Sequence, residues 1–301
     1  MTLIQKNIRI LKPKKISTWR KISLGSWRPT GDSSILTQLE LDAEPALELL
    51  SRINADRAVD KVRISFMHLF AKALGMAITK HPQINAIVRW GRIYPRISVD
   101  IFFHIANNFE DAEDLSGTVI RSIDEKNLDT IAAEIDNAVV QIRSGQDKNF
   151  AVLKSVFRLV PGFLSKIFID LMSFIMYSLN IWSPLFGSSR DSFGSIMLSN
   201  VGSFGIDNAF APIAPYTRIP MVVTLGAIRK HPFVMGDQVV VRKTVRIGFV
   251  FDHRICDGVQ VQKMLLELER LLTIDKDFLL SPRAKRGTLV KKQVFKEKRG
   301  Q

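Results

Sequence analysis

Residues 245–258 read VRIGFVFDHRICDG, and this stretch decides the fold. Every second side chain from Val245 to Phe251 is apolar, which is the pattern of a β-strand with one buried face. His253 follows at the strand end, and Asp257-Gly258 precedes a helical pattern, with the glycine expected to permit a tight turn. A rigidly held imidazole that titrates near neutral pH is suited to removing a proton from a thiol or hydroxyl. The stretch therefore predicts a catalytic group between a strand and a helix.

The rest of the chain supplies further strands and helices in a mixed order. Alternating or continuous apolar runs predict strands at 35–41, 97–106, 117–122, 193–199, 220–228 and 238–242. Apolar residues at helical spacing predict helices at 42–53, 65–78, 128–143 and 259–272. Because strands and helices interleave without strict alternation, we expect a large α/β sandwich in which helices cover a mixed sheet.

Charge is concentrated at the two ends of the 301-residue chain, whose net charge is +14. Residues 1–31 hold eight Lys or Arg and no acid, and residues 283–301 hold eight Lys or Arg and one Glu. Such ends bind anionic lipid or nucleic acid, or are simply solvated. No nucleic-acid-binding motif accompanies them, so we do not expect a nucleic-acid partner. The single cysteine, Cys256, excludes an internal disulfide, and we expect it to act as a small apolar residue.

Residues 156–186 read VFRLVPGFLSKIFIDLMSFIMYSLNIWSPLF and form an unusual apolar segment. Serines, an asparagine and a proline interrupt it, so it falls short of the roughly 20 apolar residues of a spanning helix. Two interpretations stay open, a helical hairpin packed on the core or a patch that dips into one leaflet of a bilayer. With the basic ends, the second interpretation predicts peripheral binding to an anionic membrane.

The N-terminal sequence MTLIQKNIRILKPKK lacks the continuous apolar core of a secretory signal. Its alternation of apolar and basic residues fits a solvated arm, a lipid-binding arm or a mitochondrial presequence. We expect a cytoplasmic protein, with peripheral attachment to the inner face of a membrane and the mitochondrial matrix as alternatives.

Two motifs together carry a family resemblance. The sequence DHRICDG at 252–258 resembles the signature of the dihydrolipoamide acyltransferase catalytic domain of 2-oxoacid dehydrogenase complexes, and of the related chloramphenicol acetyltransferases. Residues 194–234, GSIMLSNVGSFGIDNAFAPIAPYTRIPMVVTLGAIRKHPFV, resemble the second motif of that family, a Ser-Asn-x-Gly turn before a Pro-rich loop and an apolar strand. Residues 65–86 and 99–131 resemble it more loosely. The resemblance implies a chloramphenicol acetyltransferase-like two-layer sandwich.

The same resemblance divides the chain and assigns roles. It implies a basic arm at 1–17, a catalytic domain at 18–281 with an apolar insert at about 151–187, and a basic tail at 282–301. His253 matches the general base, and Ser199 matches the serine that hydrogen-bonds the tetrahedral oxyanion. Asp257 matches an aspartate that shapes the site through an ion pair with an arginine such as Arg20. Supporting roles fall to Gly258, Asn200 and Arg254, and the other histidines (His68, His81, His104 and His231) are assigned to structure.

The reaction implied is direct acyl transfer between coenzyme A and a second nucleophile, with acyl-CoA as substrate and without a metal. In the family the histidine and the serine come from adjacent subunits of a trimer, so a homotrimer or a multiple of one is expected. We expect a stand-alone enzyme with no lipoyl domain and no covalently bound lipoate on this chain. The alternatives are a lipoyl-dependent component of a 2-oxoacid dehydrogenase complex served in trans, and a non-catalytic scaffold of the same fold.

Overall fold

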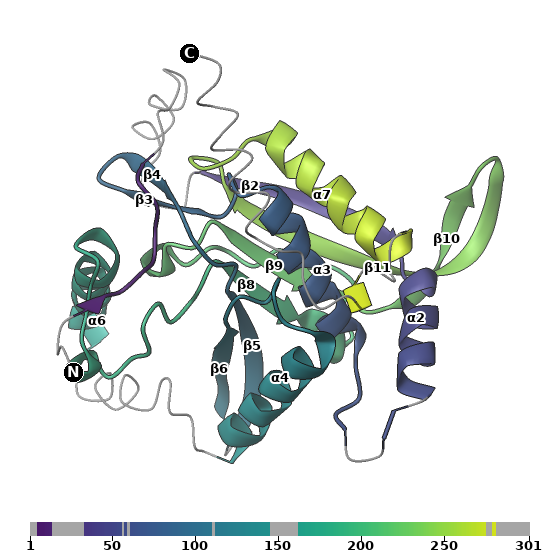
Figure 1. The fold of residues 1–301 in the computed structure, drawn as a ribbon, viewed down its shortest axis with the longest axis horizontal. Helices are drawn as coiled ribbons and strands as arrows, with labels where there is room; N and C mark the ends of the chain where they lie inside the picture. Colours follow the sequence, from purple (N-terminus) through teal and green to yellow (C-terminus); the bar gives the residue numbers. More distant parts are fainter. Residues whose placement is uncertain are drawn as a thin grey trace.

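The computed structural model describes residues 5–13, 33–55, 57–58, 61–109, 112–144, 162–274 and 279–280 (Figure 1). The strands are β1 (Gln5–Lys6), β2 (Ser34–Asp42), β3 (Ala86–Arg89), β4 (Arg92–Pro95), β5 (Ile101–Phe109), β6 (Ala112–Ile120), β7 (Ile181–Trp182), β8 (Ile196–Asn200), β9 (Met221–Leu225), β10 (Arg229–Met235) and β11 (Gln238–Asp252). The helices are α2 (Glu44–Ala55), α3 (Phe66–Lys80), α4 (Leu128–Arg143), α6 (Gly162–Ser173) and α7 (Gly258–Thr273).

A seven-stranded mixed sheet is the centre of the fold. Its order is β10-β11-β9-β8-β5-β6, and β2 pairs with β11. Neighbours β5, β8 and β9 run parallel, whereas β11 is antiparallel to β9, β2 and β10. The expected α/β sandwich with a mixed sheet is therefore confirmed.

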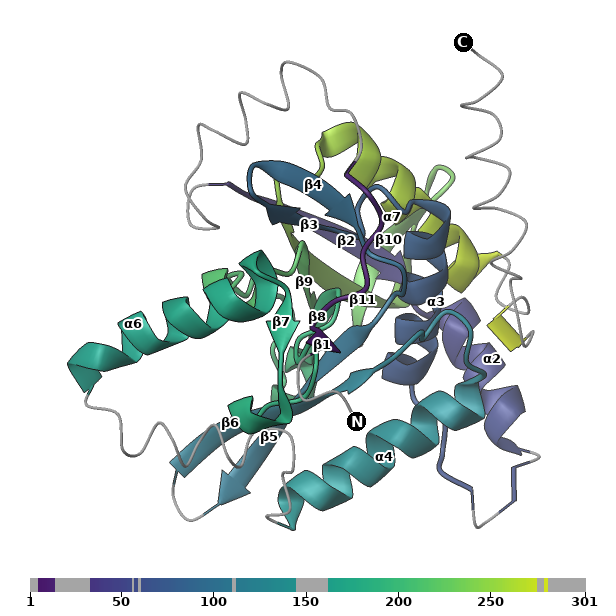
Figure 2. The same ribbon diagram turned by 60° about the vertical axis from the view of Figure 1, so that its left-hand side comes forward.

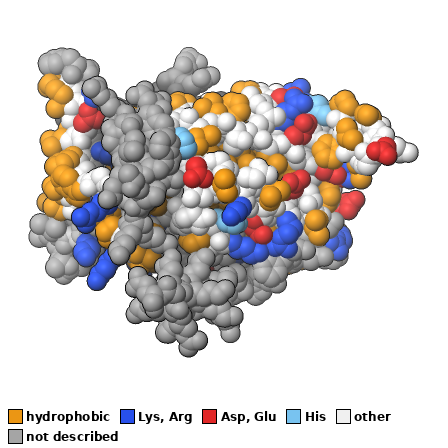
Figure 3. Space-filling model, turned by 90° about the horizontal axis from the view of Figure 1, so that it is seen from above, with side chains coloured by type: hydrophobic (Ala, Val, Ile, Leu, Met, Phe, Trp, Pro, Cys, Tyr) orange, Lys and Arg blue, Asp and Glu red, His pale blue; other side chains and the backbone are white. Residues whose placement is uncertain are grey.

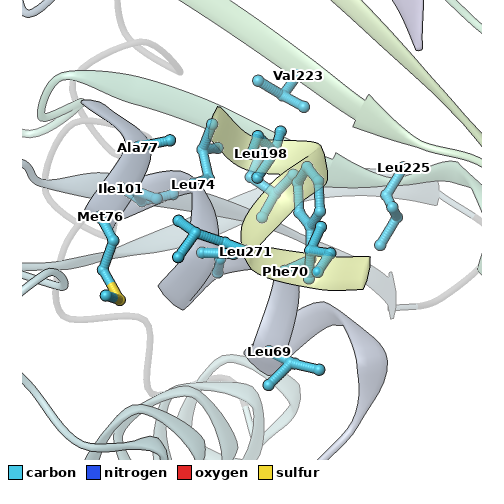
Figure 4. Packing of buried hydrophobic residues seen from close by; sticks show 14 of the residues in the cluster. Leu69, Phe70, Leu74, Met76, Ala77, Ile101, Leu198, Val223, Leu225 and Leu271 are labelled. Carbon is cyan, nitrogen blue, oxygen red and sulfur yellow. The ribbon is translucent and has the colours of Figure 1, made fainter. Parts of the chain in front are cut away.

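Helices cover one face of this sheet and bury the main core (Figure 1). Figure 4 shows Leu69, Phe70 and Leu74 of α3 and Leu271 of α7 packed among sheet residues that include Leu198 and Val223. The amphipathic periods of α3 and α7 place their apolar stripes on this side, where the two helices also contact each other. Burial of the apolar face of each helix thus fixes its position against the sheet.

A smaller cluster of apolar residues covers the opposite face of the sheet. Phe102, Met197, Val222 and Val250 point to this side and pack with Ile213 and Ile219, which belong to the chain between β8 and β9. We call this side the loop-covered face. Strand residues therefore alternate between the helix-covered core and the loop-covered face, as expected for a sheet buried on both sides.

Several strands differ from the local expectations. The runs at 238–242 and 245–251 belong to one 15-residue strand, β11, because pairing with β10 and then with β2 satisfies its backbone throughout. The hairpin of β3 and β4 and the strand β10 were not expected at all. Strand β5 begins at Ile101, four residues after the expected start at 97.

The apolar segment is only partly packed. Helix α6 continues into a π-helical turn, Phe174–Ser178, and the whole rod extends away from the sheet (Figure 2). Met176 and Tyr177 at its inner end are buried with Ile8 and Ile87 in a small separate cluster. The outer part is exposed, as described below. Among the described helices none is long and apolar enough to cross a bilayer.

The N-terminal strand is tied to this segment. β1 pairs with β7, and the buried Asn7 side chain donates to the Met176 carbonyl at 3.0 Å and accepts from the Asp191 amide at 2.8 Å. Residues 5–8 of the expected basic arm thus pack on the apolar segment, and residues 9–11 bond to the main chain of residues 95–97. Residues 1–4 and 14–17 of that arm and the C-terminal tail lie outside the described part of the chain.

The core can be tested within one helix. Replacing Leu271, which is fully buried in α7, by alanine should lower the free energy of unfolding by about 2–5 kcal/mol, because a cavity is left beside α3. The control Leu266→Ala removes an exposed side chain of the same helix and should change it by less than about 0.5 kcal/mol. Urea unfolding at one fixed protein concentration measures both. Equal losses would contradict the assigned face of α7.

Candidate active site

The loop after β11 is held by main-chain hydrogen bonds to two other segments. The amide of Asp252 donates to the Pro220 carbonyl at 2.9 Å, and the amide of His253 donates to the Ser33 carbonyl at 2.7 Å. Ser33 directly precedes β2, and Pro220 directly precedes β9. Neighbouring strands on both sides of β11 therefore fix the backbone that carries His253.

The His253 ring is oriented by the same loop. Its Nδ1 lies 2.8 Å from the carbonyl oxygen of Cys256. Since a carbonyl can only accept, Nδ1 carries the proton, and in the neutral ring Nε2 is the unprotonated nitrogen. The half-buried ring therefore presents a proton acceptor from a fixed position. Cys256 is itself fully buried in the main core, in agreement with the apolar role expected for it.

A buried ion pair flanks the histidine on both sides. Arg254 Nε donates to Asp252 Oδ1 at 2.9 Å, and Arg254 Nη2 donates to Asp252 Oδ2 at 2.6 Å. Asp252 Oδ1 also accepts from the Arg254 amide and from Ser33 Oγ. Both side chains are buried, so this two-point contact fixes the loop shape around His253. Arg254, for which a supporting role is expected, thus pairs with Asp252, an acid at the end of β11 that sequence reasoning missed.

Asp257 and Gly258 begin α7. Asp257 Oδ1 accepts from the Gln260 amide at 3.4 Å, and Gln260 Oε1 accepts from the Asp257 amide at 2.9 Å, which together form a capping box. Arg20, the expected ion-pair partner of Asp257, lies outside the described residues. The expectation that Gly258 is needed for a tight turn was wrong, because it lacks a left-handed backbone and an added Cβ would meet nothing within 4 Å.

Ser199 and Asn200 lie at the carboxyl end of β8. Ser199 points to the loop-covered face, since Met197 two residues earlier packs there. Asn200 ends the strand, and its carbonyl accepts from Ser203 Oγ at 2.7 Å. The Ser199 hydroxyl is half-buried, and within the described residues it makes no hydrogen bond, so it can donate to a ligand.

A single chain keeps Ser199 and His253 apart. Ser199 pairs with Thr224 of β9, which is level with Gly248 of β11. From Gly248 the antiparallel strand runs five residues further to His253, about 16 Å at about 3.3 Å per residue. The two predicted groups therefore lie toward opposite ends of the sheet, two strands apart.

No group of three or more His, Cys, Asp or Glu side chains positioned to hold a metal ion occurs in the described part of the chain. The polar groups of the site are thus the His253 ring, the Asp252–Arg254 pair, the capping box and the Ser199 hydroxyl. Their arrangement can supply a base and an oxyanion donor to an acyl-transfer reaction.

Comparison with known families agrees with this chemistry. The model of the 2-oxoacid dehydrogenases acyltransferase (catalytic domain) family matches residues 33–155 and 191–280. The break at residues 156–190 overlaps the apolar segment. The match therefore contains both the Ser199 and the His253 motifs.

The individual curated relatives share little sequence identity with this chain. The chain is 21% identical over 238 residues to the dihydrolipoyllysine-residue acetyltransferase component of the pyruvate dehydrogenase complex of Zymomonas mobilis, covering 79% of this chain and 44% of that protein. It is 23% identical over 238 residues to the lipoamide acyltransferase component of the branched-chain alpha-keto acid dehydrogenase complex of Bacillus subtilis, covering 78% and 46%. The chain thus spans about half the length of the curated relatives it matches.

Solved structures share the fold. A probable dihydrolipoamide acetyltransferase from Listeria monocytogenes superposes with a TM-score of 0.58 at 18% identity, covering 91% of this chain and 97% of that one. The cubic core of a pyruvate dehydrogenase multienzyme complex gives a TM-score of 0.62 at 17% identity, covering 89% and 94%.

The ion pair beside His253 generates a stability prediction. Arg254→Met should lower the free energy of unfolding by about 3–5 kcal/mol, because it leaves the Asp252 carboxylate buried without its counter-charge. The control Arg246→Met, on β11 itself, breaks a half-exposed pair with Glu40 and should cost about 1 kcal/mol or less. Urea unfolding measures both. Adding Asp252→Asn to Arg254→Met should recover part of the loss, and no recovery would argue against the assigned contact.

Proposed function

This chain belongs to the family of 2-oxoacid dehydrogenase acyltransferase catalytic domains, and we propose that it transfers an acyl group between coenzyme A and a second nucleophile. The observation that carries the proposal is the orientation of the His253 ring, whose Nδ1 contacts the Cys256 carbonyl so that Nε2 is the unprotonated nitrogen of the neutral ring. An acyl transfer needs such a base for the thiol or hydroxyl that attacks. The half-buried Ser199 hydroxyl supplies a donor for the charge that develops on the acyl oxygen.

The reaction balances with these two groups. Nε2 of His253 takes the proton of the acceptor as its sulfur or oxygen attacks the acyl-CoA carbonyl. Ser199 donates a hydrogen bond to the resulting oxyanion. The intermediate then collapses, the carbon–sulfur bond to coenzyme A breaks, and the departing thiolate takes the proton from His253. The products are the acylated acceptor and free coenzyme A, which is a substrate here and not a resident cofactor.

The separation of the two groups supports an active site between subunits. Since about 16 Å of β11 lies between the level of Ser199 and His253, we place Ser199 of one subunit against His253 of its neighbour. A homotrimer, or a multiple of one, closes such a head-to-tail contact into a ring. The active assembly proposed is therefore oligomeric.

Mixing variants tests both parts of this mechanism. His253→Ala should lower kcat by about 100- to 10,000-fold, and Ser199→Ala by about 100- to 1,000-fold. When the two inactive variants are unfolded, mixed and refolded together, some sites pair an intact His253 with an intact Ser199. Acyl transfer from acetyl-CoA to a dihydrolipoyl or other thiol acceptor should then partly return.

Two results would contradict the mechanism. Near-normal turnover by His253→Ala would remove the assigned base. A fully active monomer in light scattering, or no recovery in mixtures that have reassembled, would remove the shared site.

We further propose that an anionic bilayer binds the exposed side of α6. Its apolar residues Leu164, Ile167, Leu171 and Phe174 recur at spacings of three and four, so they form one stripe, and each is 39–64% exposed. Trp90 extends the stripe, because its ring meets Phe174 edge-on at 5.7 Å and is 62% exposed. Together they make a continuous apolar surface, the α6 stripe, of the kind found on interfacial helices.

Charge around the α6 stripe favours an anionic lipid surface over a neutral one. Lys6 on the neighbouring β1 and Arg92 beside Trp90 are exposed, whereas Lys166 on α6 pairs with the exposed Asp170 and adds no net charge. Figure 3 shows hydrophobic and basic side chains side by side at this end of the molecule. Each basic group near an anionic leaflet contributes about 1 kcal/mol. The inner end of α6 contacts the turn Pro215–Thr217 on the loop-covered face, so a bilayer on the stripe would lie next to the Ser199 side of the sheet.

Flotation with vesicles tests the membrane contact. The intact protein should float with phosphatidylglycerol-containing vesicles at low salt and detach at high salt. Ile167→Gln with Leu171→Gln should weaken binding at least about tenfold, since two large apolar side chains leave the interface. The control Val259→Gln with Leu266→Gln changes exposed residues of α7 and should float normally. If the intact protein stays unbound, or if only its oligomer size changes with the stripe, the proposal is wrong.

A further inference from the structure

His104 lies next to Ser199 in the sheet. Parallel strands β5 and β8 pair up to Phe103 and Leu198, and each strand continues by one residue to His104 and Ser199. Adjacent strands are about 4.8 Å apart, so these two residues are direct neighbours. In the sequence they are 95 positions apart, and nothing in the local pattern of either strand connects them.

Both side chains point to the same side. Phe102 precedes His104 by two residues, Met197 precedes Ser199 by two, and both pack on the loop-covered face. Since side chains alternate along a strand, His104 and Ser199 share that face. The row across the sheet at this level is His104, Ser199, Thr224 and Gly248.

Thr224, the other neighbour of Ser199, is already committed. Its hydroxyl contacts the carbonyl of Ala209 and lies 3.3 Å from that of Gly248. His104 differs, because within the described residues its ring makes no hydrogen bond. Its ring packs edge-on against Phe102 at 5.1 Å, and burial lowers its pKa, which keeps the imidazole neutral. A neutral imidazole has one N–H donor and one acceptor.

The two neighbouring groups are not hydrogen-bonded in this structure, and we propose that a turn of the His104 ring makes it a positioning residue for Ser199, donating a ring N–H to Ser199 Oγ. With one lone pair of Oγ occupied in this way, the hydroxyl proton turns toward the acyl oxygen. A hydrogen bond received by the hydroxyl also polarises it and strengthens the bond that it donates. His104 therefore assists the oxyanion contact without touching the substrate. The inference rests on the proposed acyl transfer and adds a residue to which sequence analysis assigned only a structural role.

A double-mutant cycle tests the coupling in the assembled full-length enzyme. His104→Leu keeps an apolar side chain of similar size and should lower kcat roughly 3- to 10-fold, with little change in KM for acetyl-CoA, as loss of one hydrogen bond implies. His104→Gln retains an N–H donor and should return kcat to within about twofold. In a Ser199→Ala background, His104→Leu should have no further effect, because the group it acts through is gone.

Nuclear magnetic resonance gives a second measurement that does not depend on activity or on the folding of a His104 variant. In protein labelled with ¹⁵N-histidine, Ser199→Ala should shift a ring nitrogen of His104. The ring of His68, whose Nδ1 accepts from the Ser65 amide in another part of the fold, is the control and should not shift.

The outcomes separate this inference from the proposed function. The inference is wrong if His104→Leu lowers kcat by the same factor with and without Ser199. It is also wrong if Ser199→Ala leaves the resonances of the His104 ring nitrogens unchanged. If His253→Ala were fully active while the His104 signal still responded to Ser199, the proposed reaction would fail and the contact would stand.

Discussion

The antiparallel pairing of β11 with β9 is the constraint on which the rest of the structure depends. It places the carboxyl end of β11, with His253, away from the carboxyl end of β8, with Ser199. Main-chain bonds to Ser33 and Pro220 lock that end from both sides. Because the pairing also aligns the apolar residues of β11 with the helix-covered core, shifting it by one residue would move all of them to the loop-covered face. The core and the separation of the two site residues are therefore fixed together.

The site is built from rigid main-chain contacts more than from side-chain networks. The Cys256 carbonyl sets the tautomer of His253, the Asp252–Arg254 pair holds the loop on which the ring is mounted, and Asp257 caps the helix that follows. Each contact lies within seven residues of the histidine. In the proposed reaction a short segment thus orients its own base, and the serine comes from a neighbouring subunit.

The two ends of the described part of the apolar segment have different surroundings. Its inner end is buried against Ile8 and Ile87 and carries the buried Tyr177, whereas its outer stripe is exposed next to basic residues. Burial of the inner end therefore stabilises α6, although its outer end extends away from the sheet. The two interpretations of this segment, packing and membrane contact, therefore concern different halves of it.

The sequence by itself determined the strand that leads to His253, the helix that follows it, and the periods of α3, α4 and α7. These are local properties, because a period of two or 3.6 residues decides which side chains share a face. It also supported the family through two motifs. It did not reveal that 238–252 is a single strand or that β3 and β4 form a hairpin, since pairing partners override weak local preferences.

Only the tertiary structure decided which strands are neighbours, and with that the chemistry around Ser199. His104 and Ser199 are 95 residues apart and become adjacent through the register of β5 and β8 alone. The orientation of the His253 ring, the buried partner of Arg254 and the exposure of the α6 stripe are also absent from any local pattern. Periodicity assigns a residue to a face, but strand order and register decide what it meets there.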